Sequence, residues 1–434
     1  MPKRILEKIL KVMARVLLRK YRPLIVGITG SVGKSSTKEA VGLVLARKYR
    51  VRMAEGNYNN EIGIPLSIIG ARSGGRSIVR WVMVFFRWLW AVVWPLRYPE
   101  VLVLEMGIDR PGDMEYLLSF VPVDVGIFTQ VSGSHTAYFG SLGNIAKEKG
   151  KLITGLPDSG FAILNADDDR VMRYQDKTKA KAVTFGFGEG ADVRAEHIVL
   201  EPEARLVKGI AFKMNYHGKS LPVRLPKVIA RHHLPAVLAA AATAIALKVN
   251  PVDIVDALTA FEPLPGRMHL LPGMHGSILI DDTYNASPTS TEAALAVLGE
   301  LTAERKVIVL GDMLELGDEA LMRHRGLSEL VIQSGAERII LVGRHMRALH
   351  TSLLEQGKSA EQVFWFERSD EAALFAASCV TEGDLVLVKG SRGMRMEWVS
   401  EKLLFDPSEA PSFLCCQSSE WRRRPFIPPT EWMD

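Results

Sequence analysis

The glycine-rich segment from Gly27 to Ser36, which reads Gly-Ile-Thr-Gly-Ser-Val-Gly-Lys-Ser-Ser, constrains the possible fold most strongly. An apolar run, Leu24 to Val26, leads into it, and a run compatible with a helix, Lys38 to Arg47, follows. Glycines let backbone N–H groups point inward, and the N-terminus of the following helix adds partial positive charge. The sequence therefore predicts an α/β domain in which a strand, a turn and a helix together bind an anion.

The side chains of this turn suit a nucleotide phosphate. Lys34 would reach the β- and γ-phosphates, and Ser35 would offer its hydroxyl to Mg²⁺. The spacing differs from that of the common P-loop, which would have a glycine where this chain has Ile28. The alternative is an ordinary strand–turn–helix corner that happens to contain a lysine. Because glycine, lysine and hydroxyl follow in the required order from Gly30 to Ser36, we favour nucleotide binding.

The composition limits the remaining possibilities. A chain of 434 residues, 47% hydrophobic and 24% charged, is long enough for two or three globular domains. Its three cysteines, Cys379, Cys415 and Cys416, form neither a disulfide framework nor a zinc-binding spacing, which is typical of a reducing cytoplasm. The net charge of +5 does not indicate a nucleic-acid partner, and no secretory cleavage site follows the first apolar residues.

Polar residues follow apolar segments that we expect to be buried strands. The run from Val101 to Gly107 ends in Glu105, at the end of a strand where open α/β sheets bind ligands. His135 is a candidate metal ligand, although a loop histidine more often serves only as a hydrogen-bonding residue. The segment Gly56–Pro65 places amides beside glycines, as in a loop that orients a ligand, although such clusters often only form turns.

The last third of the chain is regular. Helical stretches alternate with apolar segments that we expect to be strands, at Ser277–Ile280, Lys306–Leu310, Arg338–Val342, Gln362–Phe366 and Leu385–Val388. This alternation predicts a mostly parallel sheet with right-handed crossovers. Residues 180–226 alternate in polarity and are rich in turn residues, so we expect short antiparallel strands there.

Two segments are both basic and apolar. Residues 3–20 repeat apolar side chains at helical spacing between seven lysines and arginines, which predicts either a helix packed on the nucleotide domain or one on a membrane surface. Residues 76–98 are rich in tryptophan, and Arg76, Arg80 and Arg87 would share one stripe of a helix. The uncharged part is too short to span a bilayer, so we expect an interfacial helix, a docked helix or a core helix.

Together these stretches resemble the Mur ligases, which are ATP-dependent amide ligases of peptidoglycan assembly. The resemblance runs from about Pro23 to Leu404. It includes the motifs Gly27–Ser36, Gly56–Pro65, Leu104–Gly107, His135–Lys149, Leu164–Asp168, Gly266-Arg-Met, Asp281–Pro288, Gly311–Gly317 and Lys389–Glu397. The chain is most similar to the members that join D-alanyl-D-alanine to UDP-N-acetylmuramoyl-tripeptide. The fold implied is a P-loop-type ATPase domain followed by a Rossmann-like α/β domain.

The resemblance also implies residue roles. The nucleotide-binding residues would be Gly30, Ser31, Gly33, Lys34, Ser35, Ser36, Asn165, Arg267 and Asp282. Glu105 and His135 would hold a second Mg²⁺, and Lys149 matches a lysine that is carbamylated in relatives. The residues facing the acceptor and the incoming amine would be Asn59, Asn60, Tyr284, Asn285, Ser391 and Arg392.

Three departures from the family pattern shape the expected organisation. First, only about twenty residues precede the phosphate strand, so we expect the uridine-nucleotide domain to be missing. Second, residues 231–236 read Arg-His-His-Leu-Pro-Ala where relatives place adenine contacts. Third, residues 76–98 are an insertion. We expect an N-terminal helix at 1–22, a central ATP-binding domain at 23–263, a C-terminal domain at 264–405 and an irregular tail at 406–434.

The leading interpretation is a cytoplasmic ligase that adds D-alanyl-D-alanine to a UDP-MurNAc-tripeptide-like acceptor through an acyl phosphate. Alternatives are a related ligase with another acceptor or amine, and an ATP-binding scaffold without catalysis. The basic apolar helices predict contact with the inner face of the membrane, a separate substrate-binding partner or a second copy of the chain.

Overall fold

The computed structural model describes residues 3–54, 56, 58–75, 77–132, 139–203 and 206–424. The chain forms two compact units. The first contains Met1–Ile198, Ala211–Arg224 and His232–Phe261, and the second contains Val199–Ile210, Leu225–Arg231 and Glu262–Asp434.

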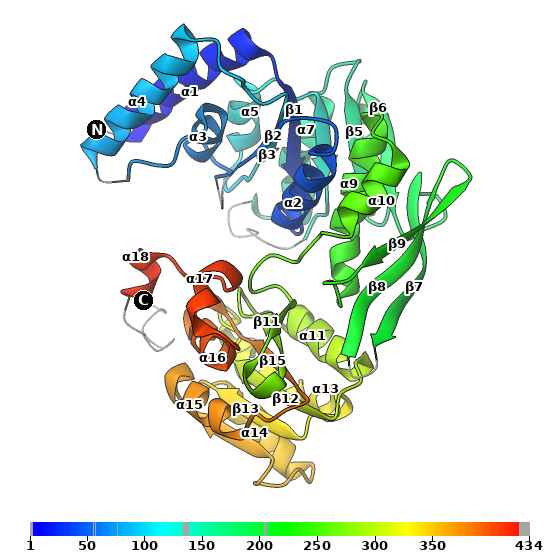
Figure 1. Ribbon diagram of the computed structural model, residues 1–434, viewed down its shortest axis with the longest axis vertical. Coiled ribbons are helices and arrows are strands. Elements are labelled where there is room, and N and C mark those ends of the chain that lie inside the picture. Colours follow the sequence, from blue (N-terminus) through cyan, green and yellow to red (C-terminus); the bar gives the residue numbers. More distant parts are fainter. Residues whose placement is uncertain are drawn as a thin grey trace. The chain divides into compact units, whose positions relative to one another are not determined.

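A nine-stranded sheet is the centre of the first unit (Figure 1). Its order is β2 (Val51–Met53), β3 (Val101–Glu105), β1 (Leu24–Thr29), β4 (Val125–Phe128), β5 (Phe161–Asn165), β6 (Lys181–Gly186), β7 (Val193–Glu203), β8 (Leu206–Tyr216) and β9 (Lys219–Leu225). All neighbouring pairs from β2 to β7 are parallel. The carboxyl ends of β1, β3 and β4 therefore meet at one edge, where the phosphate loop begins.

Helices cover both faces of this sheet. One face carries α2 (Lys34–Leu45), α9 (Leu234–Ala246) and α10 (Pro251–Leu258), which contact one another. The other side carries α3 (Gly63–Ile69), α5 (Asp113–Leu118), α7 (Leu142–Thr154) and α8 (Asp169–Met172), with α1 (Lys3–Tyr21) and α4 (Ile78–Val93) packed beyond α3. Successive strand residues alternate between the two layers because side chains on a strand point to opposite faces.

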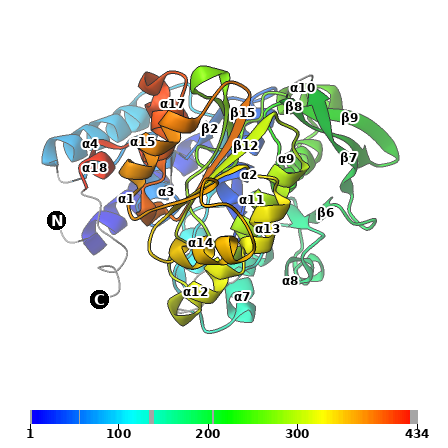
Figure 2. The ribbon, with the colours of Figure 1, turned by 90° about the horizontal axis from the view of Figure 1, so that it is seen from below.

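The second unit is built on a six-stranded sheet. Figure 2 labels its strands β12 (Arg305–Gly311) and β15 (Asp384–Lys389). The order of the sheet is β10 (His269–Pro272), β11 (Ile278–Asp282), β15, β12, β13 (Arg338–Val342) and β14 (Val363–Phe366). Only β10 runs antiparallel to its neighbour. Two apolar clusters, one on each face, alternate along the strands, as expected when helices cover both sides of a parallel sheet.

The helices of the second unit divide between these clusters. One cluster includes side chains of α11 (Pro288–Glu300), α13 (Ser328–Gln333) and α14 (Met346–Glu355), with α12 (Ala320–Arg325) against α14. The other includes α15 (Ser369–Cys379), α16 (Glu397–Leu403) and α17 (Ala410–Phe413). The helix α18 (Ser419–Arg422) follows, and the 3₁₀ turns are η1 (Gln175–Lys177), η2 (Arg231–His233), η3 (Met274–Gly276), η4 (Gly317–Glu319), η5 (Arg392–Met394) and η6 (Pro407–Glu409).

The predicted fold class is confirmed, and the five strands expected in the last third correspond to β11–β15. Two expectations were wrong. Residues 180–226 are not purely antiparallel, because β6 pairs parallel with both β5 and β7. The tail from residue 406 is not wholly irregular, because its described part contains η6, α17 and α18.

Candidate active site

The phosphate loop has the backbone that its glycines predict. Gly30 and Gly33 adopt φ values of 147° and 82°, a region that L-residues rarely occupy. A Cβ built on Gly30 would lie 1.9 Å from the hydroxyl oxygen of Thr129, whereas one on Gly33 meets nothing within 4 Å. Glycine is therefore required at position 30 by the positive φ and by the lack of room for a Cβ. At position 33 it is favoured by the positive φ alone. Gly33 is also the N-cap of α2, so the positive end of that helix faces the loop.

Lys34, Ser35 and Glu105 lie together at this edge of the sheet. The Lys34 ammonium donates to the carbonyl oxygens of Gly30 and Ser31, at 2.9 and 3.2 Å. The Ser35 hydroxyl donates to Glu105 Oε2 at 2.8 Å, and the Asn59 amide donates to Glu105 Oε1 at 3.0 Å. Each oxygen of the buried Glu105 carboxylate thus accepts a hydrogen bond, and the two hydrogen bonds fix the orientation of the side chain.

Lys149 approaches the same loop from the opposite layer of the domain. Its ammonium donates to the carbonyl oxygen of Gly30 at 2.9 Å, and the residue is only 3% exposed. Burial and repulsion from Lys34 lower the pKa of Lys149 to about 7, against attraction by Asp109 and Glu105. A lysine with such a pKa is partly neutral at physiological pH, so its nitrogen has a free electron pair available for chemistry.

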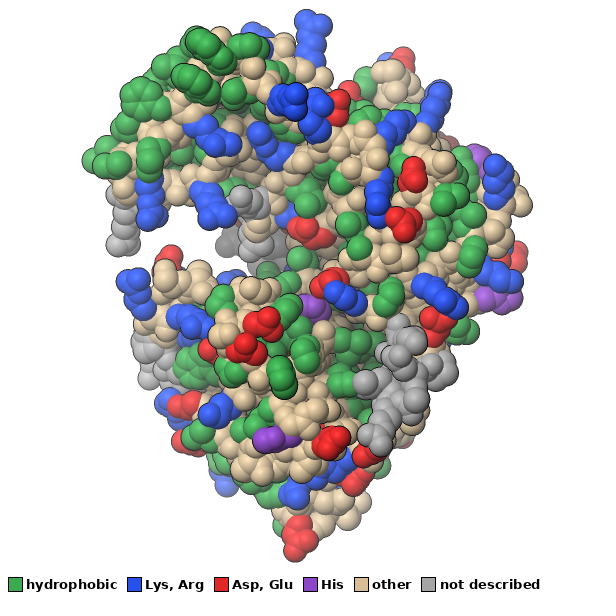
Figure 3. All heavy atoms as spheres, viewed as in Figure 1, with side chains coloured by type: hydrophobic (Ala, Val, Ile, Leu, Met, Phe, Trp, Pro, Cys, Tyr) green, Lys and Arg blue, Asp and Glu red, His purple; other side chains and the backbone are tan. Residues whose placement is uncertain are grey.

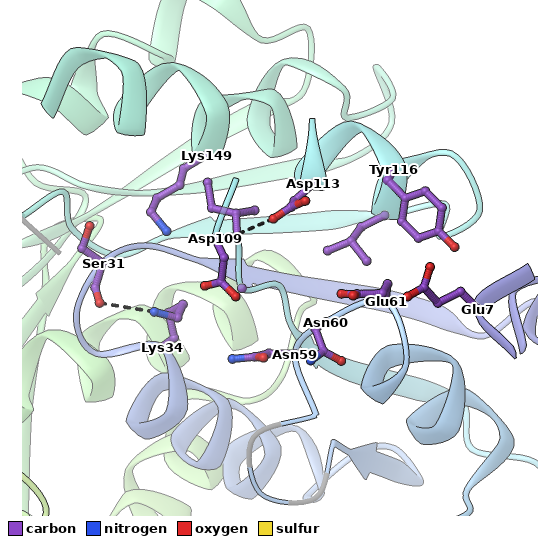
Figure 4. Close-up of a pocket in the computed structure, with 13 residues that line it drawn as sticks. Glu7, Ser31, Lys34, Asn59, Asn60, Glu61, Asp109, Asp113, Tyr116 and Lys149 are labelled. Carbon is purple, nitrogen blue, oxygen red and sulfur yellow. Dashed lines mark hydrogen bonds between the residues drawn. The ribbon is translucent and has the colours of Figure 1, made fainter. Parts of the chain in front are cut away.

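A pocket of about 320 Å³ opens beside the loop. Figure 4 shows Lys34, Lys149 and Asp109 directed towards its interior, with Asn59 below them and Glu7 and Tyr116 at the other end. The wall includes Ser31, Asn60, Glu61 and Asp113. Two lysines and several carboxylates facing one cavity can hold a phosphate, a metal ion and a substrate carboxylate together.

Other predicted residues of the first unit have local roles in the structure. Asn60 accepts from the backbone N–H groups of Ile62 and Gly63 at the start of α3, and it also lines the pocket. Ser36 is buried in the first turn of α2. The Asn165 amide oxygen accepts from the backbone of Asp167, so the structure does not join it to the phosphate loop.

His135 lies outside the described residues, and so the pairing of Glu105 with His135 stays a prediction. Across the part of the chain that the structure describes, three or more histidine, cysteine or acidic side chains nowhere gather as a metal site.

The candidate residues of the second unit meet at the carboxyl ends of β11 and β15. Asp282 and Lys389 are register partners in these strands, and their side chains form a buried ion pair at 2.7 Å. Lys389 also donates to the carbonyl oxygen of Asn285, and Asp282 accepts from the backbone N–H of Met268. The predicted nucleotide residue Asp282 and the predicted substrate residue Asn285 are thus held by one lysine.

A row of arginine and aromatic side chains continues from this pair. The Arg267 guanidinium lies 4.4 Å from the centre of the Tyr284 ring, and Arg392 lies 6.0 Å from the same ring. The Ser391 hydroxyl donates to the carbonyl oxygen of Ala286 and accepts from the backbone of Leu314. Arg267, Tyr284 and Arg392 therefore come together as predicted, while the Ser391 hydroxyl is engaged in fixing the backbone around the row.

Sequence reasoning missed several neighbours of both groups. Asp109 faces Lys149 in the pocket. Its position just after the strand that ends in Glu105 could have indicated a residue of the binding site. Trp421, in the segment expected to be irregular, stacks on Arg392 at 4.6 Å and donates to Glu397. Nothing in the local pattern around Trp421 pointed to that contact.

The residues at the phosphate loop fit ATP and Mg²⁺. A left-handed glycine at a helix N-terminus leaves backbone N–H groups available to phosphate oxygens. The Ser35 hydroxyl and the Glu105 carboxylate are hard oxygen donors, the type that Mg²⁺ prefers, and phosphate oxygens and water commonly complete its coordination.

The fold and this loop define an ATP-dependent enzyme of the P-loop type. Sequence profiles of two domains match the chain: the Mur ligase middle domain over residues 95–244, and the Mur ligase, glutamate ligase domain over residues 266–392. The chain belongs to the Mur ligase family and is an ATP-dependent ligase.

Individual relatives agree. The UDP-N-acetylmuramoyl-tripeptide–D-alanyl-D-alanine ligase of Mycobacterium tuberculosis (strain CDC 1551 / Oshkosh) is 30% identical, over 88% of this chain and 73% of its own. The enzyme of that name from Bacillus subtilis is 27% identical, over 92% and 79%. The crystal structure II of MurF from Acinetobacter baumannii matches with a TM-score of 0.75 at 27% identity, over 91% and 79%. MurF from Thermotoga maritima in complex with ADP gives 0.71 at 25%, over 94% and 84%.

Proposed function

We propose that the enzyme joins D-alanyl-D-alanine to the terminal carboxylate of a UDP-N-acetylmuramoyl-tripeptide or a similar acceptor. The observation that carries this proposal is the arrangement of Ser35, Glu105, Lys34 and Lys149 around one glycine loop. That arrangement suits phosphoryl transfer, and it occurs in a chain that matches ligases with this substrate pair over most of its length.

The reaction follows from the chemistry of carboxylates, which are poor electrophiles. An oxygen of the acceptor carboxylate would attack the γ-phosphorus of ATP, and the bond from that phosphorus to the bridging oxygen of ADP would break. The amine nitrogen of D-alanyl-D-alanine would then attack the acyl carbon of the resulting acyl phosphate. The C–O bond would break, phosphate would leave, and the nitrogen would lose its proton to form the amide.

The protein's task in this reaction is to hold groups and to balance charge. Lys34 and the N–H groups at the start of α2 would stabilise charge on the transferred phosphoryl group. One Mg²⁺ held by Ser35 and a second held by Glu105 and His135 would neutralise phosphate oxygens. In the second unit, Arg267 and Asp282 would contact the nucleotide, and Tyr284, Asn285, Ser391 and Arg392 would face the amine.

We also propose that Lys149 is carbamylated. Its depressed pKa makes the neutral amine available, and that nitrogen would attack CO₂, form an N–C bond and release a proton. The product is an anion at a buried position beside the predicted metal, where an ammonium would be repelled. Lys149→Ala should lose activity and recover part of it with added formate or acetate, whereas Lys147→Ala, on the exposed side of α7, should keep it.

Phosphate release from ATP tests the main proposal. Release should require both UDP-MurNAc-tripeptide and D-alanyl-D-alanine, and Lys34→Ala should abolish it. Release that requires a different acceptor or amine would identify a related ligase instead. Binding of ATP without turnover for any pair in a panel of acceptors and amines would identify a non-catalytic scaffold.

The reaction is proposed to take place in the cytoplasm, with the enzyme attached to the inner face of the membrane or to a separate substrate-binding protein. An exposed apolar face on α1 and α4 supports attachment of this kind.

A further inference from the structure

The helix α4 turns an almost wholly apolar side to solvent. Within it only Val84 and Ala91 are buried. The outward side includes six apolar residues that are between 46% and 69% exposed: Val79, Val82, Met83, Phe86, Trp90 and Val93. Figure 3 shows hydrophobic side chains gathered over α4 and α1. A contiguous apolar surface of this kind on a folded chain marks a site of interaction.

The neighbouring helix α1 extends this surface. The Trp88 indole donates to the carbonyl oxygen of Met13, and the Lys20 ammonium donates to the carbonyl oxygens of Ala91, Val92 and Trp94. These contacts hold the two helices side by side.

The sides of α1 have different environments. Leu10, Ala14 and Leu17 are buried in the core, whereas Ile5, Ile9 and Val12 form an exposed stripe at helical spacing. We call this stripe, together with the outward side of α4, the α1–α4 face. Glu7 of α1 also lines the pocket at the phosphate loop, so the helix that bears part of the face forms part of the pocket wall.

Basic side chains lie beside the α1–α4 face, and the segment that contains α4 has no acidic side chain. Between Glu61 and Glu100 the chain contains five arginines and no acidic residue. Arg80 and Arg87 of α4 are exposed and lie about 20° apart on a helical wheel, along one edge of the apolar side. In α1, Arg4, Lys8 and Arg19 are likewise exposed. An occupant of the face must therefore be apolar in the middle and anionic around it.

Geometry and charge separate the candidate occupants. Among the described residues no helix is long and apolar enough to cross a membrane, and the sixteen residues of α4 reach only about 24 Å. A symmetric pair of chains would bring the same face against itself, and residues 62–99 would offer the arginines of the partner no acidic side chain. A bilayer surface with anionic lipids offers both acyl chains and negative headgroups.

We propose that the α1–α4 face binds the surface of an anionic lipid bilayer, with both helices lying in the interface. The apolar side of α4 would enter the acyl region while Arg80 and Arg87 remain at the headgroups. Trp90 and Trp94, stacked at 5.4 Å near the end of α4, have the amphipathic rings that are enriched at this depth. The attachment does not depend on the proposed reaction, because no residue of the face belongs to the candidate active site.

Flotation with vesicles tests this proposal. The purified full chain should float at low salt with vesicles of equal phosphatidylcholine and phosphatidylglycerol, and not with phosphatidylcholine alone. Phe86→Glu with Trp90→Glu should abolish flotation, whereas Val252→Glu, an exposed apolar residue on α10, should not change it. Arg80→Gln with Arg87→Gln should weaken partitioning roughly 30-fold, from about fivefold for each basic group. The matched control is Arg170→Gln with Arg173→Gln, exposed positions at α8.

Circular dichroism and the thermal unfolding midpoint would check that each variant is folded. We expect folded variants because all the substituted positions are exposed to solvent. Absence of flotation at low salt would overturn the proposal, as would equal loss in the control variants. Dimers in solution that separate on Phe86→Glu with Trp90→Glu would also overturn it, because the face would then be occupied by a second copy. Flotation that does not change when the face is altered would assign lipid binding to another part of the chain.

Discussion

The burial of Lys149 lowers its pKa, and this shift links the stability of the protein to pH. Its folded pKa of about 7 lies below the ordinary 10.5 of lysine. Between these values the unfolded chain binds a proton that the folded chain does not. The contribution of Lys149 to stability is therefore fully present above about pH 10.5 and is lost as the pH falls towards 7.

This linkage predicts a pH-dependent stability difference. In CO₂-free buffer, the unfolding free energy of the protein should gain about 1.4 kcal/mol from Lys149 as the pH rises from 8 to 9. Lys149→Met should remove that contribution, because methionine does not titrate, while Lys147→Met should retain it. Denaturant unfolding at several pH values measures the difference. Equal slopes for the protein and Lys149→Met would show that Lys149 does not have a depressed pKa.

A second residue-scale prediction concerns Glu105. Glu105→Gln leaves one oxygen and one amide group where Ser35 and Asn59 both donate, so one donor would face another donor. Turnover should fall by about 100-fold or more, since a carboxylate at the predicted metal site is lost, and the Mg²⁺ titration should shift to higher concentration. Glu115→Gln, on the exposed side of α5, is the control. An unchanged Mg²⁺ titration would contradict a metal role for Glu105.

At the scale of elements, α18 connects the end of the described chain to the candidate amine site. The Trp421 ring lies against the guanidinium groups of Arg392 and Arg395, and its indole N–H donates to the buried carboxylate of Glu397 at 2.8 Å. The Trp421 ring thus stacks on the guanidinium group of Arg392, a predicted residue of the amine site.

Replacing Trp421 separates packing from hydrogen bonding. Trp421→Phe removes the N–H to Glu397 and should destabilise the second unit by about 1–3 kcal/mol. Trp421→Ala removes the ring as well and should in addition raise the KM for D-alanyl-D-alanine, because Arg392 loses its stacking partner. Thermal unfolding and steady-state kinetics at saturating ATP measure the two effects. A normal KM in a folded Trp421→Ala variant would show that α18 does not act on the amine site.

The elements differ in how far the sequence could predict them. The strands β11–β15 are continuous apolar runs between turn residues, so local pattern was sufficient. The strand β6 was assigned to the wrong arrangement because a short alternating segment looks the same whether its partners are parallel or antiparallel. Residues of the phosphate loop were found because their spacing is fixed by the loop itself. Asp109 and Trp421 were missed because tertiary contacts place them. The segment of α4 was predicted to be a helix, but its pattern left open whether that helix is interfacial, docked or part of the core.

For the whole molecule, the sequence predicted one boundary near residue 263, whereas the chain passes between the two units five times. The first passages occur at 198/199, 210/211, 224/225 and 231/232, and the last at 261/262. The inserted segments belong to the second unit's core: Ile229 and Ala230 are buried with Met268, Ile280 and Ala286. Residues 1–261 thus supply part of the packing of the second unit.

This threading predicts the outcome of a single cut. A protease site introduced between residues 261 and 262 should yield two fragments that remain associated on gel filtration, because Leu225–Arg231 stays packed in the second unit. Ile229→Ala in the cut protein should weaken that association, since removing a buried isoleucine side chain costs about 2–5 kcal/mol. Val252→Ala, exposed on α10, should leave it unchanged. Two independently folded fragments that separate after cutting would show that the inserted segments are not needed by the second unit's core.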